Sequence, residues 1–215
     1  MTEVVPVARR QVPTPLTVAF EGIDGTGKTT QIELLEAALQ ARGLTVLVTG
    51  VFRTSYGQAV RSWLMDAARM AEVSLRSQVF LLGSAMSQLV DEIARQVADV
   101  VLIDRFVYTT MSYHGGGLKM GVAAVEEIYA PVMRQFQPDL VLVLDMPPAL
   151  IASRQSASDR VEHMDLSFFT RVRAAYVELA ARLPAAVLVD ASQDKSAVHQ
   201  QVLSQVMARL QQPRC

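Results

Sequence analysis

Five short runs of mostly apolar residues recur along this chain, and they constrain its fold more than any other feature. They occupy residues 16–20, 45–49, 100–104, 140–145 and 186–190. The runs are nearly continuous rather than alternating between apolar and polar positions, which is typical of strands covered on both faces. Stretches with helical periodicity separate them. The pattern predicts an α/β fold, a three-layer sandwich in which helices cover both faces of a five-stranded parallel sheet.

The helical stretches and the chain ends define the expected domain. The expected helices cover residues 28–42, 57–71, 75–98, 107–113, 123–136, 147–154, 167–183 and 195–210. Residues 1–15 contain three prolines and no apolar period, so we expect a disordered tail there. Residues 16–215 are expected to form a single domain.

The charge balance and the cysteine content limit the possible partners and compartments. The chain has 20 Lys and Arg against 21 Asp and Glu, a formal net charge of −1. This balance argues against electrostatic binding to a nucleic-acid polymer or an anionic membrane. The lone cysteine, Cys215, excludes an internal disulfide. Because the chain also lacks a long apolar run and a secretory signal, we expect it to be cytoplasmic.

A glycine-rich segment lies between the first strand and the first helix. Residues 22–29 read Gly-Ile-Asp-Gly-Thr-Gly-Lys-Thr and match the phosphate-loop pattern G-x-x-x-x-G-K-[ST]. Glycines let backbone N–H groups converge on phosphate oxygens at a helix N-terminus. Lys28 is expected to bridge the β- and γ-phosphates of ATP, and the Thr29 hydroxyl to ligate Mg²⁺. The expected cofactor-binding residues are Gly22, Ile23, Asp24, Gly25, Thr26, Gly27, Lys28, Thr29 and Thr30. The sandwich is thus expected to be of the P-loop NTPase type.

Two charged residues follow the third strand. Asp104 ends that strand, at the edge of the sheet where α/β folds bind ligands. A carboxylate there can hold Mg²⁺ through water, and the neighbouring Arg105 can clamp a phosphate. A surface ion pair or a helix cap is the alternative explanation for such a pair.

A charged stretch follows the fourth strand and its short helix. It contains Arg154, Asp159, Arg160, Glu162 and His163. Arginines on a segment that closes over ATP can neutralise the charge that develops on the transferred phosphoryl group. A solvated charged loop is the alternative. Together with the phosphate loop, the spacing favours a small lid at about residues 154–164.

These segments together resemble the thymidylate kinase family. Residues 20–31, Phe-Glu-Gly-Ile-Asp-Gly-Thr-Gly-Lys-Thr-Thr-Gln, are similar to its phosphate loop, and Asp104-Arg105-Phe106 is similar to its Asp-Arg-Tyr segment. The similarity continues in the same order over residues 16–210, including the lid. The resemblance implies phosphoryl transfer from ATP to a nucleoside monophosphate, by default dTMP to dTDP. It also implies Mg²⁺ as a cofactor and a homodimer packed through helices.

The resemblance implies roles for single residues. Asp24 would lie near the acceptor and its phosphate, and Arg105 would contact the phosphates being joined. Family members without an arginine inside the phosphate loop usually supply one from the lid. The expected catalytic residues are therefore Lys28, Arg105, Arg154, Arg160 and Asp24.

The acceptor half departs from the family pattern. The family usually carries Thr-Arg-Glu-Pro-Gly-Gly after the second strand, whereas residues 49–57 read Thr-Gly-Val-Phe-Arg-Thr-Ser-Tyr-Gly, with Arg53 as a substitute for the phosphate contact. Leu82 and Met86 stand where the family places a phenylalanine that stacks on thymine and an arginine that hydrogen-bonds the base. Leucine cannot stack as an aromatic ring does, and methionine cannot donate to a carbonyl oxygen. His114 replaces a family glutamine.

Recognition of the acceptor therefore stays open at this point. Either another side chain takes over thymine recognition, or the acceptor is a different molecule; the candidates for the first case are Arg76, Gln78, Phe80 and His114. Leu82 and Met86 equally fit a place in the core, and His114 a place on the surface. The expected acceptor-binding residues are Arg53, Phe52, Leu82, Met86, Arg105, Tyr113 and His114, and the expected metal ligands are Thr29 and Asp104.

Three functions compete on these grounds. The first is an ATP-dependent nucleoside-monophosphate kinase that acts on dTMP. The second is a kinase for a modified nucleotide or another small molecule, which the changed acceptor positions favour. The third is a nucleotide-binding protein that has lost transfer and acts by interaction; the complete donor motif argues against it.

Overall fold

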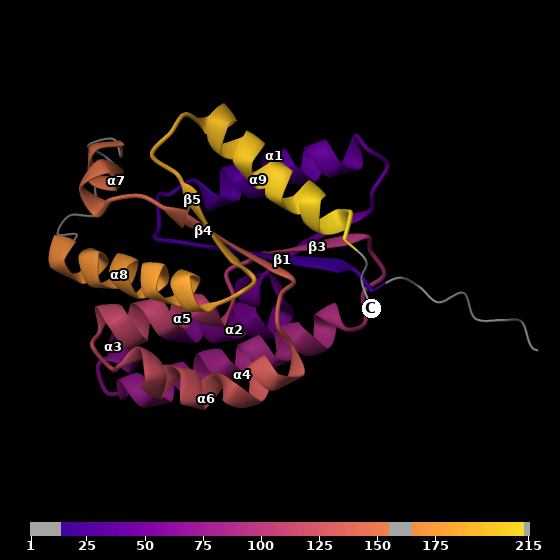
Figure 1. Cartoon of the computed structure of the whole chain (residues 1–215). Helices are drawn as coiled ribbons and strands as arrows, with labels where there is room; N and C mark the ends of the chain where they lie inside the picture. The colour runs from indigo at the N-terminus through magenta and orange to yellow at the C-terminus, as the bar shows by residue number, and fades with distance from the viewer. Residues whose placement is uncertain (1–13, 155–164, 213–215) are drawn as a thin grey trace, which may run out of the picture.

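The apolar runs form a five-stranded sheet in the computed structural model, which describes residues 14–154 and 165–212 (Figure 1). Its strands are β1 (Leu16–Glu21), β2 (Val46–Thr49), β3 (Val100–Asp104), β4 (Leu140–Asp145) and β5 (Ala186–Asp190). Their order is β2-β3-β1-β4-β5, and all neighbours are parallel. The central strand β1 is buried along its whole length, as expected for a strand covered on both faces. The prediction of a parallel α/β sheet is confirmed.

Helices cover both faces of the sheet and complete a three-layer sandwich (Figure 1). On one face, α1 (Lys28–Gln40) packs against α9 (Lys195–Leu210). The opposite side carries α2 (Ser55–Leu64), α3 (Ala67–Met70), α4 (Leu75–Ile93), α5 (Val107–Thr110), α6 (Val122–Gln135) and α8 (Leu166–Arg182), and the short α7 (Pro148–Arg154) follows β4. In the part of the chain that the structure describes, no helix combines the length and apolar character needed to cross a membrane.

Several helices differ in extent from the sequence prediction, and the predicted helices 57–71 and 75–98 are two clear cases. The stretch 57–71 was predicted as one helix but forms two, α2 and α3. α2 also begins earlier than predicted, because the Thr54 side chain caps it by accepting a hydrogen bond from the Gly57 N–H (2.9 Å). α4 ends at Ile93, before the predicted end at residue 98, where the chain turns toward β3.

The helix that follows β3 changes its hydrogen-bond pattern after one turn. α5 continues as a π-helix over Met111–Gly117, in which the Leu118 N–H donates to the Tyr113 carbonyl five residues earlier (2.8 Å). This segment lies directly against α8: a Cβ at Gly117 would come within 2.4 Å of the Phe168 ring. The sequence predicted an ordinary α-helix here, and the π-helix is a correction to that prediction.

The carboxyl ends of β1 and β3 lie next to each other, where the strand order changes direction. Phe20 in β1 pairs with Asp104 in β3, so the segments after these two strands leave the sheet side by side. In parallel α/β sheets such a switch point forms a crevice that binds ligands. The fold therefore brings the phosphate loop (22–30) next to the residues that follow β3.

Candidate active site

The glycine-rich loop turns sharply between β1 and α1, where the sequence predicts it. Gly22 has φ 130°, and a Cβ at this position would lie 2.4 Å from the Leu144 carbonyl oxygen, so no other residue fits. Gly25 and Gly27 also have positive φ, 86° and 89°. Since α1 begins at Lys28, the unpaired N–H groups of its first turn lie at this loop. The loop thus presents a helix N-terminus, which favours anions.

Lys28 folds back onto the loop. Its Nζ donates hydrogen bonds to the carbonyl oxygens of Gly22 (3.0 Å) and Ile23 (2.8 Å), and the residue is only 6% exposed. Burial, together with the positive charge of Arg105, lowers the pKa of Lys28 to about 7, although the Asp24 carboxylate opposes this shift. The amine is therefore balanced between its neutral and protonated forms near neutral pH.

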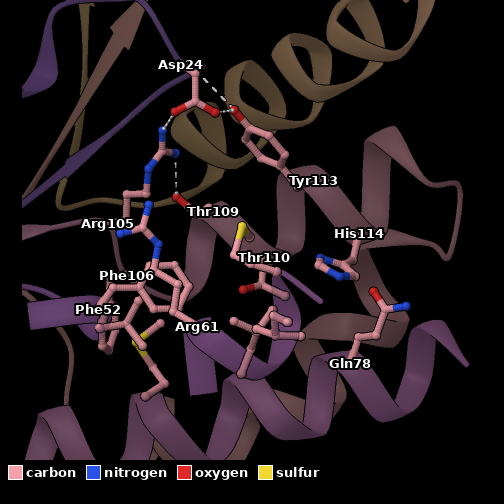
Figure 2. Close-up of a pocket in the computed structure, with 15 residues that line it drawn as sticks. Asp24, Phe52, Arg61, Gln78, Arg105, Phe106, Thr109, Thr110, Tyr113 and His114 are labelled. Atoms are coloured by element: carbon pink, nitrogen blue, oxygen red, sulfur yellow. Dashed lines mark hydrogen bonds and ion pairs between the residues drawn. The ribbon is translucent and has the colours of Figure 1, made fainter. Parts of the chain in front are cut away.

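Asp24, Arg105 and Tyr113 form a hydrogen-bonded group at the open end of the crevice (Figure 2). Arg105 donates to Asp24 and to the Gly22 carbonyl (3.1 Å), and Tyr113 donates to Asp24 (2.8 Å). Burial alone would raise the pKa of Asp24, but the charges of Arg105 and Lys28 hold it below its usual value. Arg105 has φ 67°, a left-handed conformation that is uncommon outside glycine.

A buried carboxylate lies behind Arg105. Glu21, at the end of β1, is fully buried and accepts hydrogen bonds from the Phe106 N–H (2.7 Å), the Thr109 hydroxyl (2.6 Å) and the Tyr176 hydroxyl (3.1 Å). Burial raises its pKa to about 6, against the hydrogen bonds and the charge of Arg105, which act in the opposite direction. Glu21 therefore connects the start of the phosphate loop to the segment after β3 and to α8. Glu21 was not predicted as a site residue; the available signal in the sequence was a glutamate at the end of a buried apolar strand.

Two cavities meet at this group. The phosphate-loop cavity, of about 390 Å³, is lined by Asp24, Gly25, Gly27, Lys28, Thr29, Thr30, Asp104 and Arg105. The second, which we call the apolar cavity, has about 430 Å³ and lies between α2, α4 and the segment after β3 (Figure 2). Asp24 and Arg105 line both cavities. Two ligands bound in them would therefore meet at these two side chains.

The phosphate-loop cavity also contains the two predicted metal ligands. Thr29 and Asp104 both line it, so a hydroxyl and a carboxylate face one space. Oxygen ligands of this kind suit Mg²⁺. Within residues 14–154 and 165–212, no cluster of three or more His, Cys, Asp or Glu side chains forms a metal site. A metal here would therefore depend on the phosphates and on water for its other ligands.

The apolar cavity gathers most of the predicted acceptor-binding residues. Those that line it are Phe52, Leu82, Met86, Arg105, Tyr113 and His114. Arg53 does not line it; its guanidinium lies 3.8 Å from the Asp104 carboxylate instead. Arg61 also lines the cavity. It was not predicted, because it lies in α2, beyond the segment that departs from the family pattern.

The structure separates the candidates for a replacement role in thymine recognition. Gln78 and His114 line the apolar cavity, whereas Phe80 and Arg76 do not. Phe80 is 58% exposed and does not line the cavity, so it is not placed to stack on a base bound there. Met86 is only 2% exposed and still lines the cavity, which reconciles its core position with a place in the site.

His114 presents an unsatisfied nitrogen. Its Nδ1 is buried and has no hydrogen-bond partner among the described residues. Burial lowers the pKa of His114, which favours the neutral imidazole. The residue is half-buried rather than a solvated surface histidine, the alternative that the sequence left open. A neutral imidazole at the cavity wall can form a hydrogen bond with a ligand.

The predicted lid lies almost wholly outside the described residues. Arg154 ends α7, and Arg160, with the rest of 155–164, is not described. The same holds for residues 1–13 of the predicted tail. The roles of Arg154 and Arg160 therefore stay predictions from the sequence.

Comparison with known proteins identifies the family. The sequence model of the family described as Thymidylate kinase matches residues 20–202. A thymidylate kinase of Bifidobacterium longum (strain DJO10A) is 36% identical over 191 residues, which cover 85% of this chain and 93% of the relative. One of Desulforudis audaxviator is 35% identical over 202 residues, covering 90% and 91%.

A solved structure agrees on the fold. The crystal structure of thymidylate kinase from Ehrlichia chaffeensis superposes with a TM-score of 0.70 and covers 91% of this chain and 99% of that one. At 23% identity this likeness supports the fold alone. The family match extends from the phosphate loop to α9 and includes both cavities. On this evidence, the chain belongs to the thymidylate kinase family.

Proposed function

We propose that this chain transfers the γ-phosphoryl group of ATP to dTMP, which yields dTDP and ADP. Relatives named thymidylate kinase support this proposal, with 36% and 35% identity. The single observation that carries it is the junction of the two cavities at Asp24 and Arg105. ATP in the phosphate-loop cavity and an acceptor in the apolar cavity would place donor and acceptor phosphates at the same guanidinium.

The chemistry requires placement and charge more than acid–base groups. An oxygen of the acceptor phosphate attacks the γ-phosphorus of ATP, a new P–O bond forms, and the bond to the β–γ bridging oxygen breaks, so ADP leaves. Arg105 and protonated Lys28 stabilise the negative charge on the transferred group. Asp24 and Tyr113 hold the Arg105 guanidinium at the junction.

Mg²⁺ and the lid arginines belong to the same proposal. Thr29 and Asp104 would hold the ion from the wall of the phosphate-loop cavity. A metal ion held by these two residues would supply positive charge against the phosphates of ATP. Arg154 and Arg160 would add positive charge from the lid, as the family resemblance implies.

A second acceptor class follows from one feature of the apolar cavity. Leu82 and Met86 line it, and neither can stack on a base as an aromatic ring does or donate a hydrogen bond to it. A pocket without such groups discriminates its substrate less strongly. A modified pyrimidine nucleotide or another small phosphate ester is therefore the second candidate acceptor.

A coupled ADP-release assay tests the proposal. The purified chain is supplied with ATP, Mg²⁺ and one acceptor at a time: dTMP, dUMP, the other nucleoside monophosphates and pyrimidine-modified analogues. We expect the highest kcat/KM with dTMP, and we expect Lys28→Ala to abolish turnover. Turnover with another acceptor but not with dTMP would refute dTMP and retain the kinase. No turnover with any acceptor, together with tight ATP binding, would favour a non-catalytic nucleotide-binding protein.

We also propose that the chain forms a homodimer through the outer surface of α2 and α4. These helices pack on each other and expose large aromatic side chains, Tyr56 (46%), Trp63 (36%) and Phe80 (58%). Exposed apolar groups gathered on neighbouring helices are typical of an interface. Sedimentation analysis of the wild-type chain and of Trp63→Glu tests this: the variant should be monomeric, and an unchanged dimer would refute this surface.

A further inference from the structure

The backbone of Arg105 is held on both sides by the end of β1. Arg105 has φ 67°, a left-handed conformation that is uncommon for a residue with a side chain. Its own N–H donates to the Phe20 carbonyl (3.0 Å), and the next N–H, that of Phe106, donates to the Glu21 carboxylate (2.7 Å). Two consecutive residues of β1 therefore hold the two peptide groups that flank Arg105.

The Glu21 carboxylate also reaches the Arg105 side chain, through one hydroxyl. Thr109 donates to Glu21 Oε2 (2.6 Å), and the Thr109 oxygen accepts a hydrogen bond from the Arg105 guanidinium (3.3 Å, Figure 2). Because a carboxylate only accepts hydrogen bonds, it fixes the direction of the Thr109 hydroxyl and leaves the oxygen lone pairs free for the guanidinium. The Tyr176 hydroxyl, from α8, donates to the same Glu21 oxygen (3.1 Å). Glu21 thus restrains both the backbone and the side chain of Arg105.

The other carboxylate on this guanidinium is in a different environment. The Asp24 side chain is 69% exposed, so water competes for its ion pair with Arg105, and bound phosphates would compete for the same N–H groups. Glu21 is fully buried and lines neither cavity, so a ligand in them does not reach it. Hydrogen bonds to a buried carboxylate are also stronger than those at the surface. The restraint from Glu21 therefore persists when ligands enter.

We propose that Glu21 is a positioning residue that holds Arg105 at the junction of the two cavities. This assignment rests on the proposed function, in which Arg105 meets both the donor and the acceptor phosphates. Glu21 touches neither ligand; it restricts the conformations of Arg105 before the phosphates arrive. A guanidinium that is already in place loses less conformational freedom on binding and in the transition state. The effect should appear in ATP binding and, more strongly, in turnover.

A double-mutant cycle separates this role from a general effect on the fold. It comprises the wild-type chain, Glu21→Gln, Arg105→Met and the double variant, at pH 8, where the Glu21 carboxyl, with a pKa of about 6, is ionised. Glutamine keeps the size of the side chain, but its amide donates to Thr109 where the carboxylate accepted, so the hydroxyl must turn. Calorimetric titration gives the Kd for ATP, and ADP release gives kcat and KM for dTMP. Thermal melting verifies that each variant folds.

The expected result is a loss that depends on Arg105. Glu21→Gln should raise the Kd for ATP by about 3- to 10-fold and lower kcat/KM for dTMP by about 10- to 100-fold. In the Arg105→Met background the same substitution should change either quantity by less than about twofold, because the group that Glu21 positions is gone. Losses of equal size in the two backgrounds would overturn the assignment, as would wild-type values in Glu21→Gln.

Two pairs of variants test the route from Glu21 to Arg105. Thr109→Val removes the hydroxyl that joins them, whereas Thr109→Ser keeps it and should retain most of the kcat/KM that Thr109→Val loses. Tyr176→Phe removes the second hydroxyl that donates to Glu21 and should also lower kcat/KM. Its matched control is Tyr129→Phe, which removes an equally buried hydroxyl that donates to a backbone carbonyl of α4 (3.3 Å) and should leave kcat/KM unchanged. Equal loss in the two members of either pair would refute this route.

The two proposals fail in different ways. Turnover of dTMP by the wild-type chain, with losses of equal size in both backgrounds of the cycle, would refute the role of Glu21 alone. Absence of ADP release with every acceptor would refute the proposed function. The cycle on the Kd for ATP would then still test Glu21, because ATP binding requires no turnover. A wild-type chain that binds no ATP would refute both proposals.

Discussion

Glu21 offers a direct test of the electrostatics behind the active site. It is fully buried, and its carboxylate accepts three hydrogen bonds, from the Phe106 N–H and from the Thr109 and Tyr176 hydroxyls. Glu21→Gln removes the ionisable group and keeps the shape. The glutamine carbonyl can still accept from Phe106, and its amide can donate to either hydroxyl, because hydroxyl groups also accept hydrogen bonds.

The expected magnitude follows from the pKa shift. Burial raises the pKa of Glu21 from 4.5 to about 6, and a tenfold change in proton affinity corresponds to about 1.4 kcal/mol. The folded chain therefore holds this proton more tightly than the unfolded chain. The stabilisation is fully present below pH 4.5 and is lost as the pH rises through 6. In full it amounts to about 2 kcal/mol.

Urea unfolding of wild type and Glu21→Gln at steps from pH 4.5 to pH 7 measures this shift. The free energy of unfolding of wild type, minus that of the variant, should fall by about 1.5 kcal/mol over this range. Most other titrating groups cancel in the difference, and Glu33→Gln on the exposed surface of α1 controls for loss of a carboxylate. A difference that stays constant or grows with pH would refute the reasoning.

Two further predictions concern the phosphate loop and the π-helix. ATP binding at pH 8 should take up about one proton, because the Lys28 amine, with a pKa of about 7, is mostly neutral before binding and becomes protonated beside the phosphates. Calorimetric titration in buffers of different ionisation heat measures this proton uptake. Uptake of the same size in Lys28→Met would contradict the assignment to Lys28. Gly117→Ala should lower the free energy of unfolding by about 3 kcal/mol, since its Cβ would come within 2.4 Å of the Phe168 ring. Gly43→Ala is the control: its φ is +80° but its Cβ would meet open space, so it should lower the free energy of unfolding by only about 1 kcal/mol. Denaturant titration measures both, and equal losses would exclude close packing as the cause.

The strands were predictable because their signal is local. Runs such as 100–104 and 140–145 are short and apolar, and they form β3 and β4 with the predicted bounds. The helix ends were harder, since α2 begins where one side chain, Thr54, caps it. The π-helix was not predictable, because an apolar period over Met111–Gly117 cannot separate hydrogen bonds that span five residues from those that span four. The close approach of this segment to α8 joins parts of the chain that are distant in sequence.

The site was predictable only where its residues are consecutive in sequence. Residues 22–30 run without a break from the glycine-rich loop into the first turn of α1, so their spacing alone indicates their arrangement. Arg53 and Arg61 illustrate the opposite case. Arg53 lies in the 3-10 helix and near Asp104, whereas Arg61 lies in α2 and lines the apolar cavity. Glu21 was missed for a related reason: its three hydrogen-bond donors come from segments at least 85 residues away in the chain.

The backbone of Arg105 has a consequence for engineering this chain. At φ 67° a non-glycine residue carries a conformational cost of about 1 kcal/mol, which glycine would avoid. Glycine would also remove the guanidinium, which donates hydrogen bonds to the Gly22 carbonyl, the Thr109 hydroxyl and Asp24. Each such bond contributes about 1 kcal/mol, so the lost bonds outweigh the relieved backbone strain. A search for stabilising substitutions that replaces residues of positive φ with glycine should therefore leave this position unchanged.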